Sequence, residues 1–568
     1  MKKLLVILAI FLLGSFTVAE KPIEKPIENK LEREITFSYP ELIDCGNYVK
    51  VHVKEANSLL AIPEKPLLPI YSLTFEFPLG TKIISVDCDK FSVEKIDLKK
   101  EILPAPKPKW IGGKLFYEIH NDGISYPDKW FSYKIGGGLS NGKHVTFLSI
   151  HFYPVRYLKE KTLEFVKQVK IKIIYKPSLQ QFLSKDKYDL LIVAPSSFAF
   201  PLQKLAEHKE RHGIATKLIK LEEIYSSQGK DKAEKIKYFI KNAVEEWGIK
   251  YVLLVGSVDK LPMRKTWFWD EYFVTDLYYA DLYDANGSFS SWDTNNNGYY
   301  GEYLHDGKTD FVDLYPDVYV GRLACSNIRE VKTVVNKIIN YETLPEKEWF
   351  NRIILCGGDT FPGNDLMEGE YMNQLVAENM SEFKIVKLWA SSGNLNAKNI
   401  FNEINKGAGF IHFSGHGSLI GWATHPYNSD EWIGFNILHT LLLFNGYKLP
   451  IIFLDACSTA HLDIYLINIK GIITKTIPCF AWTFIKNPRG GAIATIGSTR
   501  VAYTLLTEGG AGYLGLHFFL AYKNNATPAE MLVQAQNDYL NNLWKDGFTI
   551  EEFILLGDPS LRIGGYYE

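Results

Sequence analysis

The chain has 568 residues, of which 46% are hydrophobic and 23% are charged, a composition typical of a globular protein. This length is too great for one hydrophobic core and predicts about two to four domains. The formal net charge is −2 and residues of both signs are mixed along most of the chain, which excludes a basic face for nucleic acid or anionic lipid.

The N-terminus has the pattern of an export signal. Lys2 and Lys3 precede an apolar run at residues 4–13, and residues 17–19 (Thr-Val-Ala) supply a cleavage site. An uncleaved membrane anchor is the weaker alternative, because the run is short for a transmembrane helix and no later stretch is long and apolar enough to cross a bilayer. We therefore predict a signal peptide at residues 1–19 and a secreted or extracytoplasmic protein that is not held in a membrane.

A linker and an all-β domain follow the signal. Residues 20–36 begin with the charged, proline-containing stretch "EKPIEKPIENK", which is typical of a tether. Later runs such as "YVKVHVK" and "VKQVKIKIIY" alternate apolar and polar residues, and prolines and glycines separate them. Period-two alternation with such punctuation predicts β-strands, so we assign residues 37–185 to a β-sandwich domain.

From residue 186 onward, short apolar strands alternate with amphipathic helices. The strand "YDLLIVAP" precedes the helix "PLQKLAEHKERHG", and the rhythm continues with the apolar segments "YVLLVGSV", "PDVYVGRLAC", "RIILCGGD", "GFIHFSGHG", "LPIIFLDAC" and "GAIATIGS". This alternation predicts an α/β fold, with a parallel sheet or sheets covered by helices. We assign two consecutive α/β subdomains, residues 186–348 and 349–568.

The six cysteines are too few and too scattered for a disulfide scaffold. The sequence also contains no CxxC pair, which a zinc site would be expected to show. Cys45 and Cys88 are a candidate disulfide pair in an oxidising compartment. The sequence does not fix that connectivity.

An acidic insert at residues 270–317 interrupts the first α/β subdomain, with eleven Asp or Glu residues against the single basic residue Lys308. Within it, "WDTNNNGYYGE" places oxygen donors around a glycine, as in the first half of a calcium-binding loop: Asp293, Asn295, Asn297 and Glu302. The EF-hand pattern has Glu at the twelfth position, where this sequence has Leu304. A structural calcium site and a solvated Asn-rich turn therefore remain equally open.

Two strands of the second subdomain end in small-residue turns that carry His416 and Cys457. In open parallel sheets ligands bind outside the carboxyl ends of the strands. The 41 residues between the two side chains suit a strand, a crossover and a strand, which would make them neighbours. A thiolate is a nucleophile and an imidazole can protonate a leaving amine, so this pair predicts nucleophilic catalysis. Either residue alone would more often be structural.

Other polar residues near the pair are weaker candidates. His412 is expected to point across the sheet away from the turn, and His461 is an alternative acid that lacks flanking glycines. Asp455 shares a strand face with the Cys if the strand continues, and we expect it to cap the next turn rather than to tune the site.

Together these motifs resemble the gingipain family of caspase-like cysteine peptidases. The resemblance is carried by "SGHGS", "PDVYVGRLAC", "GAIATIGSTR" and "LLGDPSLRI", it extends from residue 188 to the end, and the β-rich segment before it looks like the family's propeptide. It implies that Cys457 is the nucleophile, that His416 protonates the leaving amine, and that Gly417 and Cys457 supply the oxyanion N–H groups. It also implies substrate binding by Asp313 and Trp422, with Asp313 favouring Arg or Lys before the scissile bond. A role of Asp313 as one more carboxylate of the acidic insert, for example as a metal ligand, is an equally open alternative.

The resemblance implies a secreted cysteine endopeptidase made as a proenzyme, with protein or peptide substrates and its own propeptide as an intramolecular inhibitor that blocks the cleft. Cleavage after Lys185 or Lys187 would release the β domain. No organic cofactor is indicated. Two alternatives stay open: a non-catalytic extracellular protein that binds its partners with calcium, and an enzyme that uses the same Cys and His on a non-peptide substrate.

Overall fold

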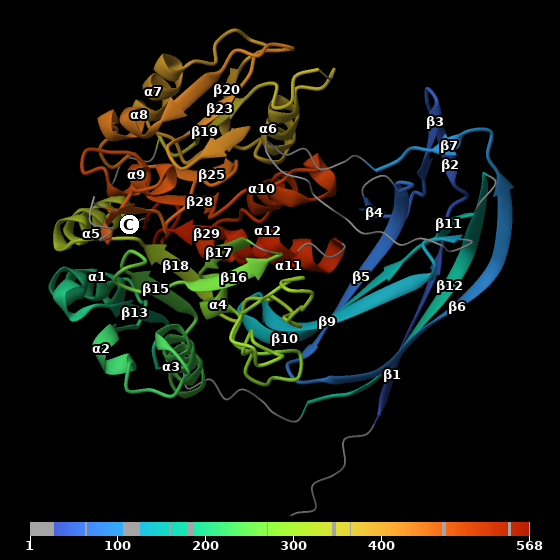
Figure 1. Cartoon of the computed structure of the whole chain (residues 1–568), viewed down its shortest axis with the longest axis horizontal. Helices are drawn as coiled ribbons and strands as arrows, with labels where there is room; N and C mark the ends of the chain where they lie inside the picture. Colours follow the sequence, from blue (N-terminus) through green and yellow to red (C-terminus); the bar gives the residue numbers. More distant parts are fainter. Residues whose placement is uncertain are drawn as a thin grey trace, which may run out of the picture.

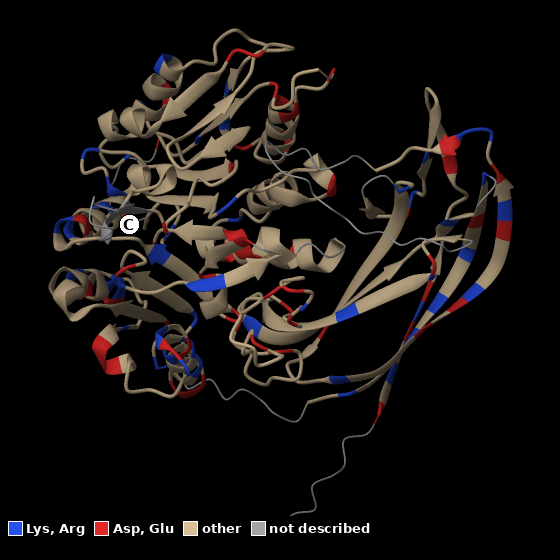
Figure 2. Ribbon diagram, in the orientation of Figure 1, with Lys and Arg blue, Asp and Glu red and all other residues tan. Residues whose placement is uncertain are grey.

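The computed structural model describes residues 28–62, 65–105, 125–158, 161–178, 187–269, 271–343, 348–363, 365–467, 473–543 and 547–566. Two bodies lie side by side, a β domain and an α/β domain (Figure 1). The predicted signal peptide and the candidate cleavage residue Lys185 lie outside the described residues. Figure 2 shows basic and acidic residues interspersed over both bodies, which agrees with the near-neutral charge.

The β domain is built from mainly antiparallel sheets, as the period-two alternation predicts. In one sheet β12 (Thr162–Lys176) pairs with β6 (Lys82–Asp97), β1 (Asn29–Thr36) and β11 (Val155–Leu158), and β8 (Ser125–Tyr126) extends it. A second sheet has the order β4 (Ser58–Leu60), β5 (Leu68–Pro78), β10 (Lys143–Phe152) and β9 (Phe131–Ser140). β2 (Glu41–Cys45), β3 (Tyr48–His52) and β7 (Glu101–Ile102) form a small third sheet, in which the short pair β3 and β7 is parallel. The inward-facing side chains share one hydrophobic core.

The α/β domain contains one ten-stranded sheet, to which both predicted subdomains contribute. Its order is β14 (Thr216–Lys220), β13 (Leu190–Ala194), β15 (Tyr251–Val255), β18 (Tyr319–Leu323), β29 (Phe553–Leu556), β28 (Ala494–Ser498), β25 (Ile451–Asp455), β21 (Phe410–Ser414), β19 (Arg352–Gly357) and β20 (Lys384–Trp389). The eight strands between the edge strands β14 and β20 are almost fully buried, as expected for a sheet with both faces covered.

The strand β29 joins the two halves of this sheet and reverses its direction. It is parallel to β18 but antiparallel to β28. The strands of the first half therefore run opposite to those of the second half. As a consequence, the amino end of β18, which follows the acidic insert, lies at the same edge as the carboxyl ends of β21 and β25. The alternating pattern did not predict this reversal.

Helices cover the sheet: α1 (Ala199–Arg211), α2 (Leu221–Ile224), α3 (Lys232–Trp247), α4 (Leu277–Ala280), α5 (Ile328–Thr343), α6 (Glu368–Asn379), α7 (Ala397–Asn405), α8 (Ile437–Leu442), α9 (Phe480–Lys486), α10 (Gly510–Leu520), α11 (Pro528–Asn542) and α12 (Gly547–Glu552). α11 begins with a capping box in which Thr527 and Glu530 satisfy each other's N–H groups, and Pro528 occupies the first turn. Within the described residues, no helix has the length and apolarity of a bilayer-spanning segment.

The two domains meet along the β9–β10 hairpin, which lies against the acidic insert and α11. The Leu139 N–H donates to the carbonyl of Pro316, and the Asn537 amide donates to the Leu139 carbonyl, each over 2.7 Å. The Phe147 ring stacks on Tyr315 with centroids 4.8 Å apart. These contacts fix the β domain on the sheet edge that also carries the carboxyl ends of β21 and β25.

Consecutive glycines in β9 make this close approach possible. A Cβ atom at Gly136 would lie 2.3 Å from ring carbons of Tyr315, and one at Gly137 would lie 2.6 Å from the carbonyl oxygen of Asp284. Real side chains do not tolerate such distances, so any larger residue would push the domains apart.

All six cysteines are free, so the expected Cys45–Cys88 bridge is not formed. Cys45 is exposed at the end of β2, whereas Cys88 is buried on β6 in a different sheet. The two residues belong to separate parts of the sandwich, which the sequence spacing did not reveal.

Candidate active site

His416 and Cys457 follow two adjacent parallel strands at the same edge of the sheet. The register of β21 and β25 pairs Phe410 with Ile451 and Ser414 with Asp455, an offset of 41 residues. His416 and Cys457 have the same offset, two residues further on. His416 and Cys457 are therefore neighbours at this sheet edge, as their spacing predicts.

Gly417 brings the backbone after β21 directly onto the Cys457 backbone. A Cβ atom at Gly417 would lie 2.2 Å from the carbonyl oxygen and 2.9 Å from the nitrogen of Cys457. Only glycine allows this approach. It places the two backbone segments that were expected to supply oxyanion N–H groups beside one another.

The His416 ring is held by a backbone carbonyl. Its Nε2 lies 2.6 Å from the oxygen of Thr360, and because a carbonyl only accepts, Nε2 carries the proton and Nδ1 is the basic nitrogen. Burial lowers the pKa of His416, and nearby His425 lowers it further, while the Thr360 hydrogen bond and the Glu368 charge oppose this. The imidazole is therefore neutral near pH 7.

Glu368, the first residue of α6, fixes the loop that presents this carbonyl. Its Oε2 accepts hydrogen bonds from the N–H groups of Thr360 and Phe361, both at 3.2 Å. The sequence predicted the helix but gave Glu368 no role, since nothing in the local pattern shows that the preceding loop reaches the His.

The Cys457 thiol is protonated in this arrangement. Its S–H donates to the carbonyl of Ala502 over 3.1 Å. Burial raises the pKa of Cys457 to about 12; the Ala502 hydrogen bond opposes the rise, and the charges of Glu552 and Asp455 add to it. The described state thus holds Cys457 as a thiol, not as the reactive thiolate.

A pocket of about 700 Å³ opens over the pair. Its walls come from β22 (His416–Ser418), β23 (Gly421–Thr424) and β24 (Ile433–Asn436), from the segment after Cys457 and from residues 501–504. Trp422 lines the pocket and is only 1% exposed, so the indole is a buried wall behind the His loop. Among the described residues, none of the β domain lines this pocket.

Three other residues near the pair take structural partners. His412 is buried, its Nδ1 lies 2.9 Å from the Asn373 amide oxygen, and burial lowers its pKa to about 3, so it stays neutral. Asp455 does not cap the following turn, because its Oδ2 accepts from the Ser414 hydroxyl at 2.8 Å on the next strand. Burial raises its pKa to about 6, against the effect of Ser414.

His461, the alternative acid, also lines the pocket but lies 3.4 Å from Asp463. Asp463 is in turn held by the guanidinium of Arg500 at 2.8 and 2.9 Å. His461 therefore lies beside the Arg500–Asp463 ion pair on the Cys side of the pocket.

Comparisons with known proteins agree with this geometry. Residues 183–564 match the family model described as peptidase family C25. The chain belongs to this family. The match confirms the gingipain-type resemblance that the motifs predicted.

Several gingipains of Porphyromonas gingivalis are similar to this C25 family member. Gingipain R2 is 23% identical over 328 residues, which are 56% of this chain and 37% of that protein. Lys-gingipain HG66 is 24% identical over 193 residues, or 34% of this chain and 10% of that protein. The chain thus matches well under half the length of these curated relatives.

A solved structure shows the same fold. The crystal structure of the Arg-specific cysteine proteinase gingipain R aligns with a TM-score of 0.50 and 20% identity, and covers 68% of this chain and 80% of that one. The caspase-like α/β architecture is therefore confirmed.

The structure does not bring Asp313 into the pocket of this C25 family member. Asp313 lies in the insert at the same sheet edge, but its Oδ2 accepts from the N–H of Gly137 in β9 at 2.8 Å. Burial raises the pKa of Asp313 well above its usual value. In this chain it anchors the β domain, because the reversed half-sheet presents the insert to the β9–β10 hairpin.

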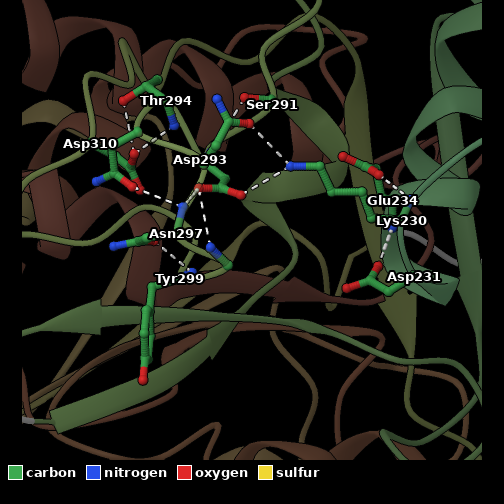
Figure 3. A network of polar contacts seen from close by, with 12 residues as sticks. Lys230, Asp231, Glu234, Ser291, Asp293, Thr294, Asn297, Tyr299 and Asp310 are labelled. Atoms are coloured by element: carbon green, nitrogen blue, oxygen red, sulfur yellow. Dashed lines mark hydrogen bonds and ion pairs between the residues drawn. The ribbon is translucent and has the colours of Figure 1, made fainter.

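The four residues of the expected calcium loop do lie together. The Asn297 N–H donates to Asp293 Oδ1 at 2.8 Å, and the amides of Asn295 and Asn297 donate to Glu302 Oε1 at 2.5 and 2.7 Å. Glu302 is 1% exposed, and its Oε2 has no hydrogen-bond partner in the described structure. Figure 3 shows how Asp293 and Asn297 converge with Asp310 from the same insert.

This donor set fits a hard cation such as Ca²⁺. Amide groups can turn by 180° to present oxygen instead of nitrogen, and carboxylate and amide oxygens are the ligands that Ca²⁺ prefers. Two of the four groups are amides, and no cluster of three or more His, Cys, Asp or Glu side chains suited to a metal is found in the described parts of the chain. The Lys230 ammonium lies 3.1 Å from Asp293 and 3.4 Å from Asn296 and supplies a positive charge to the loop (Figure 3).

Proposed function

We propose that this chain is a cysteine endopeptidase in which Cys457 is the nucleophile and His416 the proton donor. The observation that carries the proposal is the shared register of β21 and β25, which places both side chains at one pocket with the Gly417 backbone against Cys457. Family membership supports the same chemistry.

In the proposed reaction the Cys457 thiol gives its proton, directly or through a water molecule, to the basic Nδ1 of His416, and the sulfur attacks the carbonyl carbon of the scissile peptide bond. The oxygen that becomes negative is held by the N–H groups of Gly417 and Cys457. The C–N bond then breaks, and the leaving nitrogen takes a proton from Nδ1 of His416, which stays oriented by Thr360. Water hydrolyses the thioester and restores the thiol.

We propose cleavage after Arg or Lys as the finer specificity. The support is that one similar structure is that of an Arg-specific cysteine proteinase and that other similar proteins are Lys-gingipains. The expected partner Asp313 is bonded to β9 in the full chain, so it would have to be uncovered before it served a substrate. Comparison of Asp313→Asn with the parent after removal of the β domain tests that role.

We further propose that the chain is exported as a proenzyme and that the β domain is its inhibitory propeptide. The β domain docks through glycines that fit Tyr315 and Asp284 closely. None of its described residues lines the pocket. Inhibition would therefore act through the contacts of the β domain with the sheet edge, and not through described residues that fill the pocket. Lys187 is exposed at the start of the α/β domain, which suits cleavage there.

Calcium is proposed as a structural ion in the loop at Asp293, Asn295, Asn297 and Glu302. The buried and unpaired Glu302 Oε2 supports it, because an unpaired carboxylate oxygen is costly without a cation or another partner.

The deciding experiment is cleavage of a peptide library that varies the residue before the scissile bond, by the purified chain without residues 1–19 and by its Cys457→Ala variant. We expect Cys457-dependent cleavage and shortening of the wild-type chain near residues 185–187. If both proteins stay inert after an added protease has cut residues 179–186, the peptidase proposal is wrong and a binding protein on this fold takes its place.

A further inference from the structure

Trp432 is an exposed aromatic residue on the His416 side of the pocket. It lies just before β24, lines the pocket, and is 56% exposed, whereas Trp422 on the neighbouring strand is 1% exposed. A single exposed apolar side chain needs no explanation on an ordinary surface. Here it stands beside the proposed catalytic histidine.

The exposed indole is nevertheless held in place. Its ring lies 3.8 Å from the ring of His425, which is itself 6% exposed. His425 is fixed by hydrogen bonds in both directions between its backbone and that of Asp359, at 2.9 and 3.1 Å, and its Nδ1 lies 2.9 Å from the Glu431 carbonyl. A large aromatic group that is preorganised but left open to solvent is typical of a binding anchor.

Trp432 and Phe361 flank the His416 ring. The Trp432 centroid lies 5.4 Å from that of His416 with the rings at 70°, and the Phe361 centroid lies 5.3 Å away at 89°. If His416 protonates the leaving amine, the residue that carries this amine must lie against His416. Its side chain then meets one or both of these aromatic rings.

The residues that line the pocket on this side carry no charge. Thr360, Phe361, Ala423, Trp432 and Gly434 have no carboxylate, ammonium or guanidinium group. The Glu368 carboxylate is bound to the N–H groups of Thr360 and Phe361, and Asp430 and Glu431 are exposed and do not line the pocket. The carboxylate that does line the pocket, Asp455, is bonded to Ser414 below Cys457. An apolar wall without a counter-charge favours an apolar side chain over an ionised one.

We propose that Trp432 and Phe361 form the subsite for the residue that follows the scissile bond, the P1′ residue, and select an apolar or aromatic side chain there. This inference rests on the proposed peptidase function. It assigns Trp432 as a specificity-determining residue, which nothing in the local sequence pattern around "NSDEWIGF" indicated.

The test compares fluorogenic peptides that differ only at P1′, with Phe or Leu against Gly or Asp, on the full chain. We expect kcat/KM to favour Phe and Leu by about tenfold or more, the discrimination that an apolar pocket typically gives. Trp432→Ala should remove most of that ratio and Trp432→Phe should retain most of it. Phe200→Ala, which removes a 74% exposed aromatic residue of α1, should leave it unchanged.

A thiol-reactive peptide probe that ends at the reacting carbonyl, with no residue after it, separates this inference from the function on which it rests. Trp432→Ala should label at Cys457 at the wild-type rate, because the probe does not reach the P1′ subsite. If Trp432→Ala is labelled normally and still favours Phe and Leu over Gly and Asp at P1′ by the wild-type ratio, the P1′ inference is wrong and the peptidase proposal is unaffected. Failure of the wild-type chain to label or cleave, also after a cut within residues 179–186, would overturn the peptidase proposal as well.

Discussion

His416 and Cys457 each stand two residues beyond the end of adjacent parallel strands, and the 41-residue offset of those strands is also the offset of the two side chains. This relationship turns two common residue types into a candidate catalytic pair. It depends on the backbone register and on Gly417, not on a direct bond between the side chains.

Replacement of His416 by Ala should lower kcat by about 10²- to 10⁴-fold, the usual contribution of a positioned proton donor. Cys457→Ala should abolish turnover. His461→Ala is the matched control, since His461 lines the same pocket but pairs with Asp463, and its effect should stay within about threefold. Equal losses for His416→Ala and His461→Ala, measured in steady-state kinetics, would show that the wrong histidine has been assigned.

The raised pKa of Cys457 should be visible in its reactivity before the β domain is removed. Burial lifts that pKa from 9 to about 12, so the thiolate fraction of the intact chain should keep rising about tenfold per pH unit between pH 6 and 10. Alkylation of Cys457 by iodoacetamide, followed by mass spectrometry, measures this slope. A plateau below about pH 8 would mean that the thiolate is already stabilised.

Asp455→Asn should stabilise the fold at neutral and alkaline pH. The folded-state pKa of Asp455, about 6, exceeds its usual 3.8, so the favourable contribution of the protonated form is complete below pH 3.8 and is lost as pH rises through 6. Asn stays neutral and keeps an oxygen for the Ser414 hydroxyl, so the gain should reach at most about 3 kcal/mol at pH 8 and about half of that at pH 5. Urea unfolding at the two pH values checks this, and a gain that is larger at pH 5 would contradict it.

Calcium should raise the unfolding temperature of the chain if the insert holds the ion, because a ligand that binds only the folded state stabilises it. Asp293→Ala should remove this effect. Lys230→Gln should tighten calcium binding, since the Lys230 ammonium lies 3.1 Å from Asp293 and repels a second cation.

Calorimetric titration with calcium measures both affinities, and Lys241→Gln is a suitable control because Lys241 pairs with Glu245 on α3 instead of the loop. If EDTA does not change the unfolding temperature of the calcium-loaded wild-type chain, the loop holds no structural calcium and is a solvated Asn-rich turn. Weaker calcium binding by Lys230→Gln would show that Lys230 supports the site.

Gly136→Ala should loosen the β domain, because the added Cβ would lie 2.3 Å from the Tyr315 ring. Overpacking of this kind costs about 1–3 kcal/mol. After a cut within residues 179–186, size-exclusion chromatography should show earlier loss of the β fragment from Gly136→Ala than from the parent. Tyr133→Ala, at an exposed position of the same strand, is the control. Co-elution as tight as that of the parent would argue against the glycine interface.

The sequence predicted the local elements well because their signals are local. Period-two alternation gave the strands of the β domain, and apolar segments between amphipathic helices gave the strands of the α/β domain. The spacing of His416 and Cys457 also predicted their meeting, since parallel neighbours joined by a crossover have a narrow range of offsets. Trp422 lines the pocket as a buried wall, and its contact with a substrate stays a prediction.

The residues that sequence reasoning missed act across long separations. Thr360 reaches His416 from 56 positions away, and Glu368 holds Thr360 through backbone N–H groups that any residue type would offer. Trp432 looks like an ordinary loop tryptophan until its ring is seen against His425. No periodicity or motif encodes such contacts.

By itself the sequence determined the element types, the family-specific motifs and the identity of the proposed nucleophile and acid. These signals come from residues that are close together in the sequence, namely backbone propensities and the residue types at strand ends. Only the tertiary structure decided that β29 joins both halves into one sheet and reverses its strand direction. This reversal sets Asp313 against the β domain, and it places the acidic insert at the sheet edge that carries the carboxyl ends of β21 and β25. The physical reason is that strand order and direction depend on which hydrophobic surfaces pack best over the whole chain. The sequence of a short apolar strand does not show which strand pairs with it.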